Sequence, residues 1–260
     1  MLVLRPAALG DTLLALPALR ALRRTYGSLT LAAQDGAARL LAAVGEVDRG
    51  IAFDDPTLAW VFRDAAPPDD EPIVAWLSGA RPAALAHALV VTPGRPPGED
   101  VHCARYLLET LPFGAPFDDR PLAVMPLTSD EVLVHPGSGS PTKNWPAEHF
   151  AWMIRALDGP VRLIVGEADH AAADALDAAL GKPLSRLQHL SLVELAARLA
   201  GCRAYVGNDS GISHLAGLSG ARTVALFGPT RPSVWSPLGP RVKVVPFETD
   251  PADVAKLLAA

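Results

Sequence analysis

Short apolar runs alternate with helix-like segments along this 260-residue chain, and the alternation stops once and then begins again. In the first half, the apolar runs predict strands at residues 1–4, 29–33, 47–53, 73–77 and 89–91. In the second half, they predict strands at residues 132–135, 161–165, 187–190, 204–207 and 223–227. Apolar residues at helical spacing predict helices at residues 12–26, 146–157, 170–180, 192–200 and 212–218. Because alternating strands and helices form parallel sheets with helices on both faces, we predict an α/β fold.

A proline-rich stretch separates the two alternating halves. Residues 112–128 contain four prolines and show no clear period. We therefore predict an N-terminal domain over residues 1–120, a linker over residues 121–130 and a C-terminal domain over residues 131–260. Half of the chain is hydrophobic, which is enough to bury a core in each of two domains of about 130 residues.

Two loops in the second half have the composition of phosphate-binding loops. They lie in residues 135–146 (HPGSGSPTKNWP) and 207–214 (GNDSGISH), and each follows a predicted strand and opens into a predicted helix. Backbone N–H groups in such a loop, together with the start of the following helix, can hold a phosphate. Ligands of parallel sheets bind at the carboxyl ends of the strands. Two such loops together suggest a diphosphate ligand.

The first of these loops offers four candidate ligand contacts. Ser138, Ser140 and Thr142 are small polar residues within it, and Lys143 follows them. A lysine there supplies a positive charge to a phosphate. The alternative is a surface lysine in a turn of small residues. Lys143 is one of only four lysines in the chain, which favours the functional interpretation.

The second loop offers further candidates at the start of a helix. Asp209 and Ser210 precede the predicted helix, so either of them could contact a ligand or only cap the helix. Gly211 allows a ligand to approach the backbone closely, and Ile212 follows it. His214 lies one turn inside the helix, where it either contacts the ligand or has a structural role.

Two acidic positions outside these loops also have candidate roles. Glu167 follows the strand predicted at residues 161–165, where a carboxylate commonly accepts hydrogen bonds from a ribose. It could equally be an acid favoured by a helix N-terminus, and Asp169 is the rival carboxylate. Asp11 follows the first predicted strand, and it is either a general base or the N-cap of the helix predicted at residues 12–26.

Four segments, taken together, resemble glycosyltransferase family 9, the ADP-heptose:lipopolysaccharide heptosyltransferases. They are LVLR…LGDTLL…PALRAL at residues 2–22, HPGS…KNWP at 135–146, DSGISHLA at 209–216 and ALFGPT at 225–230. The segments occur in the order that they have in the family. The resemblance implies a GT-B fold, in which two Rossmann-like domains have parallel sheets that face a central cleft. The C-terminal domain would bind the donor and the N-terminal domain the acceptor.

The same resemblance implies an activity and roles for particular residues. It implies an inverting, metal-independent transferase that moves a sugar from a nucleoside-diphosphate donor to a hydroxyl of a glycan or lipopolysaccharide-core-like acceptor. By the family name, the sugar would be heptose and the donor ADP-linked. Asp11 would deprotonate the acceptor, Lys143 and the helix start at residues 211–214 would stabilise the leaving diphosphate, and Glu167 would hold the ribose. We expect no cofactor or metal ion, and the chain contains no Asp-x-Asp pair.

The N-terminal half departs from the family pattern. It is shorter than usual, and its first 120 residues carry eleven arginines, no lysine and fifteen acidic residues. Such a half has no basic excess for a phosphorylated lipid acceptor. Two alternatives therefore stay open, namely a non-catalytic nucleotide-sugar binding protein with a reduced acceptor domain and a GT-B-fold sugar-nucleotide epimerase. The motif around Asp11 argues against the epimerase.

Composition sets the remaining expectations. A net charge of −5 argues against a nucleic-acid partner. No apolar run reaches the roughly 18 residues of a transmembrane segment. The two cysteines lie far apart in the sequence and in no motif, which fits a reducing compartment. We therefore expect a cytoplasmic protein, for which a peripheral association with the inner membrane face stays open.

Overall fold

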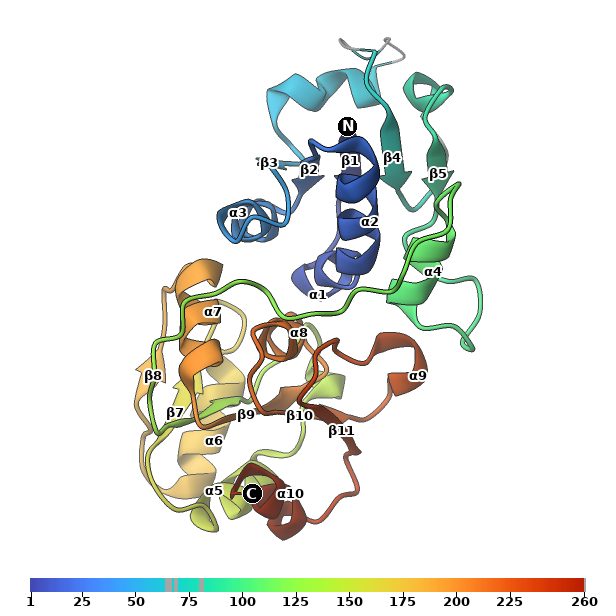
Figure 1. The fold of residues 1–260 in the computed structure, drawn as a ribbon. Coiled ribbons are helices and arrows are strands. Elements are labelled where there is room, and N and C mark those ends of the chain that lie inside the picture. The colour runs from blue at the N-terminus through green and yellow to red at the C-terminus, as the bar shows by residue number, and fades with distance from the viewer. Residues whose placement is uncertain (64–66, 68–69, 80–81, 260) are drawn as a thin grey trace. The chain divides into compact units, whose positions relative to one another are not determined.

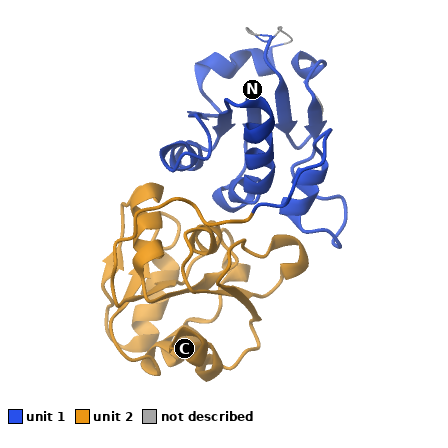
Figure 2. Ribbon diagram, viewed as in Figure 1, with its two compact units in different colours: residues 1–118 blue, residues 119–260 orange. Residues whose placement is uncertain are grey.

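The chain forms two compact units, Met1–Asp118 and Asp119–Ala260, in the computed structural model, which describes residues 1–63, 67, 70–79 and 82–259 (Figure 1; Figure 2). Each unit has its own parallel sheet and its own apolar core. Residues 121–130, predicted as a linker, lie at the start of the second unit. There the N–H groups of Leu122 and Ser129 donate to the carbonyls of Leu218 and Gly201, which lie at helix ends.

The first unit holds a five-stranded parallel sheet in the order β3-β2-β1-β4-β5. Its strands are β1 (Leu2–Arg5), β2 (Thr30–Ala33), β3 (Arg49–Ala52), β4 (Ile73–Trp76) and β5 (Val90–Thr92). Its helices are α1 (Leu9–Leu13), α2 (Leu16–Tyr26), α3 (Asp35–Ala43) and α4 (Cys103–Glu109), with 3-10 turns η1 (Pro56–Phe62) and η2 (Ala83–Leu85). The strand order is Rossmann-like, and the direction of the connections reverses where β1 and β4 lie side by side.

The helix predicted at residues 12–26 is in fact two helices, α1 and α2. Pro17 lies in the first turn of α2, where it has no N–H to donate. A proline ring also collides with the carbonyl four residues earlier in a continuous helix, here that of Leu13, the last residue of α1. The helix therefore stops and begins again, and Pro17 is tolerated because it lies in a first turn.

The second unit holds a six-stranded parallel sheet in the order β11-β10-β9-β6-β7-β8. Its strands are β6 (Val132–His135), β7 (Val161–Ile164), β8 (Arg186–Leu187), β9 (Ala204–Asn208), β10 (Thr223–Phe227) and β11 (Val242–Pro246). Its helices are α5 (Ala147–Arg155), α6 (His170–Leu180), α7 (Leu192–Gly201), α8 (Gly211–Leu218), α9 (Pro232–Trp235) and α10 (Pro251–Ala259), with a 3-10 turn η3 (Pro141–Lys143). The order of all six strands is Rossmann-like, and the direction of the connections reverses between β6 and β9, which is the topological switch point.

The strand order places the two predicted phosphate-binding loops beside each other. In the pairing of β6 with β9, His135 lies opposite Gly207, so both strands end at the same edge of the sheet. One prediction nearby is wrong in part, because β8 covers only Arg186–Leu187 rather than residues 187–190. Among the described residues, no helix is long and apolar enough to cross a membrane.

Candidate functional site

The loop after β6 is held by hydrogen bonds among its own small side chains. The Ser138 hydroxyl lies 2.6 Å from the carbonyl oxygen of Ser140 and 2.7 Å from Oδ1 of Asn144. The hydroxyls of Ser140 and Thr142 lie 3.0 Å apart. The loop then closes in η3, whose last residue is Lys143. Hydrogen bonds within the loop thus determine its conformation, and Lys143 lies at its end.

Lys143 joins the two loops through an ion pair. Its Nζ donates to Oδ2 of Asp209 at 2.7 Å, and the hydroxyl of Thr230 donates to the same oxygen at 2.7 Å. Asp209 is buried, whereas about a third of the Lys143 side chain is exposed. A lysine held in this way has lost much of its conformational freedom before a ligand arrives. Its remaining N–H donors are available to a phosphate.

The start of α8 supplies a second binding element for an anion. Ser210 is the N-cap, and its hydroxyl accepts from the N–H of Ser213 at 3.4 Å. Gly211 and Ile212 are the first residues of the helix. N–H groups at this position point along the helix axis toward an anion. His214 is buried in the next turn. Of the two alternatives for Asp209 and Ser210, capping applies to Ser210.

A buried polar network fixes the geometry of these loops. His135, at the end of β6, places Nε2 2.9 Å from Oδ2 of Asp169 and Nδ1 3.2 Å from the Ser210 hydroxyl. Asn208, at the end of β9, accepts from the Trp145 N–H at 2.8 Å and donates to the carbonyl of Pro136 at 2.8 Å. Sequence reasoning missed His135 and Asn208 as functional residues. The signal was present, because each is a polar residue that ends a buried strand.

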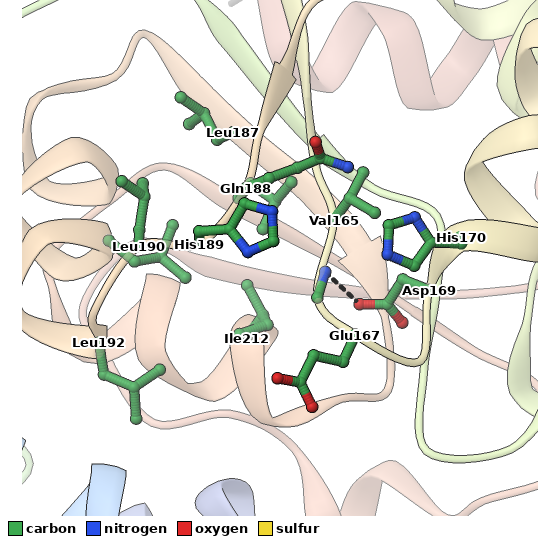
Figure 3. Close-up of a pocket in the computed structure, with 13 residues that line it drawn as sticks. Val165, Glu167, Asp169, His170, Leu187, Gln188, His189, Leu190, Leu192 and Ile212 are labelled. Carbon is green, nitrogen blue, oxygen red and sulfur yellow. Dashed lines mark hydrogen bonds between the residues drawn. The ribbon is translucent and has the colours of Figure 1, made fainter.

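Glu167 and Asp169, which the sequence left as rivals, have different surroundings. Burial alone would raise the pKa of Asp169, but the hydrogen bond and charge of His135 and the N–H of Gly166, 2.9 Å away, together hold it below its usual value. The Asp169 carboxylate is therefore used in hydrogen bonds within the protein. Glu167 is exposed, and it lines a pocket of about 220 Å³. Figure 3 shows its carboxylate near Ile212 at that pocket.

The pocket has largely apolar walls and a strained backbone on one side. Val165, Leu187, Leu190 and Ile212 contribute apolar side chains (Figure 3). His189 also lines it, and its φ of 56° lies in the left-handed region, the only such value for a non-glycine residue in the described part of the chain. Such backbone strain clusters at ligand sites. An apolar ligand group that also carries polar atoms matches this lining chemically.

Asp11 lies in the first unit, so it belongs to a different sheet from these loops. It is inside α1, whose N-cap is Ala8, so the N-cap alternative for Asp11 is wrong. Oδ2 of Asp11 lies 3.6 Å from Nη2 of Arg95, and its carbonyl oxygen accepts from Nη2 of the buried Arg5 at 3.0 Å. Asp11 lines a cavity of about 540 Å³, which Phe62 also lines. This cavity lies at the carboxyl ends of β1 and β4, the switch point of that sheet.

Solved structures share the fold of two Rossmann-like units. E. coli ADP-heptose lipopolysaccharide heptosyltransferase II matches with a TM-score of 0.77 and 18% identity over 99% of this chain and 97% of that one. E. coli heptosyltransferase WaaC with ADP matches with a TM-score of 0.75 and 20% identity over 100% and 99%. These likenesses, together with the two parallel sheets, define the fold as GT-B.

The family follows from the sequence match. Residues 111–256, more than half of the chain, match glycosyltransferase family 9 (heptosyltransferase), and the chain belongs to this family. Lipopolysaccharide heptosyltransferase 2 of Salmonella typhimurium is 32% identical over an alignment of 130 residues that covers 46% of this chain and 37% of the relative. Lipopolysaccharide heptosyltransferase 1 of Pseudomonas aeruginosa is 37% identical over 105 residues, 39% and 29% of the two chains. The matches thus span about a third of each curated relative.

Proposed function

We propose that the second unit binds a nucleoside-diphosphate sugar, with ADP-heptose as the donor. The observation that carries this proposal is the position of Ile212. It lines the 220 Å³ pocket and also lies in the first turn of α8, so a nucleoside pocket and an anion site adjoin each other. The exposure of Glu167 at the pocket supports a role for its carboxylate as the acceptor of hydrogen bonds from ribose hydroxyls. The diphosphate then meets Lys143 and the first N–H groups of α8.

We further propose that the chain is an inverting transferase that needs no metal ion. Negative charge builds on the diphosphate as the bond to the sugar breaks, and fixed donors aimed at that charge lower the barrier. Lys143 and the start of α8 supply such donors, while Asp11 removes the proton from the attacking hydroxyl. The acceptor is a sugar hydroxyl of a glycan or of a lipopolysaccharide core. The reaction would take place in the cytoplasm, with the protein associated peripherally with the inner membrane face. The names of the relatives support heptose transfer.

Calorimetry with ADP, UDP and GDP tests donor binding. We expect ADP to bind best, and Lys143→Ala to weaken ADP about tenfold or more, because it removes a charge-assisted hydrogen bond and leaves the Asp209 carboxylate without its cationic partner near the phosphates. Lys182→Ala is the matched control, since Lys182 is an exposed lysine of the same unit. Absence of binding by all three nucleotides at millimolar concentration would overturn the proposal.

One observation favours a second function, binding of the donor without transfer. The family match begins at residue 111, so it covers the second unit and only the end of the first. Incubation with ADP-heptose separates the two functions. A transferase releases ADP when it transfers the sugar to an acceptor glycan, or slowly when it transfers the sugar to water. Asp11→Asn abolishes that release. A binding protein leaves ADP-heptose intact, and Asp11→Asn then changes nothing.

A further inference from the structure

His135 connects the two parts of the proposed donor site, although it lines neither of them. Its ring is buried at the end of β6. One side contacts Asp169, whose carboxylate also accepts a hydrogen bond from the Gly166 N–H at the edge of the nucleoside pocket. The other side contacts Ser210, the N-cap of α8. The ring therefore lies between the pocket loop and the helix start that the proposed function assigns to phosphate.

The hydrogen-bonding roles along this chain of contacts follow from chemistry. Asp169 is held ionised, and a carboxylate can only accept hydrogen bonds, so Nε2 of His135 carries a hydrogen. On the other side of the ring, Nδ1 lies 3.2 Å from the Ser210 hydroxyl, within hydrogen-bond distance. The lone pairs of that hydroxyl stay available to the N–H of Ser213. The ring thus bridges Asp169 in the pocket loop and Ser210 at the helix cap.

A fixed Ser210 hydroxyl determines which groups of α8 face a ligand. Ser213 uses its N–H on the cap, and its own hydroxyl donates to the carbonyl of Asn208 at 2.5 Å. The N–H groups of Gly211 and Ile212, which precede Ser213, are thereby left for an anion. If the Ser210 hydroxyl turned away, the first turn of α8 would lose its side-chain cap.

We propose that His135 is a positioning residue that couples the pocket loop to the start of α8, so that nucleoside and diphosphate are bound in one register. This inference rests on the proposed donor site. The titratable groups on the surrounding elements include Lys143 after β6, Glu167, Asp169 and His170 after β7, Tyr205 on β9, and Asp209 and His214 around the start of α8. Of these, only Asp169 is hydrogen-bonded to the ring among the contacts described.

Two substitutions separate the two sides of the ring. The Gln side chain places its amide near the position of Nε2, so His135→Gln keeps the contact to Asp169 and loses the one to Ser210. The shorter Asn side chain reaches the position of Nδ1, so His135→Asn keeps the contact to Ser210 and loses the one to Asp169. Calorimetry with adenosine then measures binding to the pocket alone. Calorimetry with ADP measures binding to the pocket together with the phosphate site.

We expect the two variants to differ in which ligand they affect. His135→Gln should bind adenosine as the wild type does and ADP about fivefold more weakly, as expected for one lost side-chain hydrogen bond. His135→Asn should weaken adenosine and ADP alike, because the pocket loop loses its anchor. His87→Gln is the matched control, since His87 is exposed in the first unit, and it should bind both ligands normally.

A second variant and a double substitution test the same inference even if one of the His135 variants does not fold. Ser210→Ala removes the hydroxyl with its contacts to His135 and to the Ser213 N–H, so we expect it to weaken ADP at least as much as His135→Gln does. Because the contact that His135→Gln breaks is already lost in Ser210→Ala, the combined variant should lose no more than Ser210→Ala alone. Additive losses, or equal effects of His135→Gln on adenosine and ADP, would overturn the inference while leaving donor binding intact. A wild type that binds no ADP would overturn both the inference and the proposed function.

Discussion

At the scale of single residues, two carboxylates two positions apart have opposite roles because their surroundings differ. Asp169 is buried and accepts from His135 and from Gly166. Glu167 is exposed at the pocket. The sequence offered both as ribose ligands, and only the direction of each side chain separates them. The exposed one stays the proposed ligand, while the buried one holds the loop.

The lowered pKa of Asp169 predicts an acid-sensitive second unit. A carboxyl whose folded-state pKa lies below its unfolded value of about 3.9 contributes stability above that value, and loses it as the pH falls through the folded pKa. Asp169→Asn should lower the stability at pH 7 by about 1 kcal/mol and flatten the loss below pH 4, as measured by urea unfolding with tryptophan fluorescence. Asp158→Asn, at an exposed position, should keep the wild-type slope. An unchanged slope in Asp169→Asn would refute this account.

At the scale of elements, close packing of α8 against the loop before β11 constrains a helix that the proposed site uses. Gly217 lies within α8, and a Cβ there would overlap the carbonyl oxygen of Leu238 and Cγ2 of Val242. The helix can approach that loop only because position 217 lacks a side chain. The orientation of the helix start therefore depends on a glycine two turns away from the candidate site.

Gly217→Ala should therefore destabilise the second unit despite the better helix propensity of alanine. Overpacking costs about 1–3 kcal/mol, which exceeds the gain of about 1 kcal/mol from replacing glycine in a helix. Thermal unfolding followed by circular dichroism measures the net effect. Gly139→Ala provides the comparison, because a Cβ at position 139 meets nothing within 4 Å. A Gly217→Ala variant as stable as the wild type would contradict the packing argument.

At the scale of the whole molecule, the candidate donor site belongs to one unit and the candidate base to the other. The apolar core of the second unit is built from residues between Val132 and Leu258. Residues 119–130 complete this unit, because Leu122 is buried in it and Ser129 satisfies a carbonyl at the end of α7. A fragment that begins at residue 119 thus contains everything that the proposed donor site needs.

We expect residues 119–260 to fold alone and to bind ADP within about threefold of the full chain, without transferring sugar. Residues 131–260 form the matched fragment, which lacks the segment around Leu122 and should unfold at a lower temperature. Calorimetry and thermal unfolding of both fragments check these expectations. A fragment 119–260 that folds but binds ADP more than tenfold weaker would mean that the first unit contributes to donor binding.

Periodicity and local chemistry determined most of the secondary structure. The strands over residues 132–135 and 223–227 and the helix over 170–180 were predicted with their observed bounds. Local rules failed where a competing local effect was overlooked, as at Pro17, which splits the predicted N-terminal helix. They also gave no prediction for β11 or α10, whose residues continue the core of the second unit.

The amino-acid sequence by itself determined the α/β class, the two loops and the family resemblance, because these depend on residue types and on their spacing. Only the tertiary structure decided which residues meet. The pairing of β6 with β9 brings Lys143 to Asp209 and His135 to Ser210, across separations of 66 and 75 residues. Strand order is set by the burial of whole sheets rather than by any local pattern, so contacts across the sheet edge cannot be read from spacing along the chain.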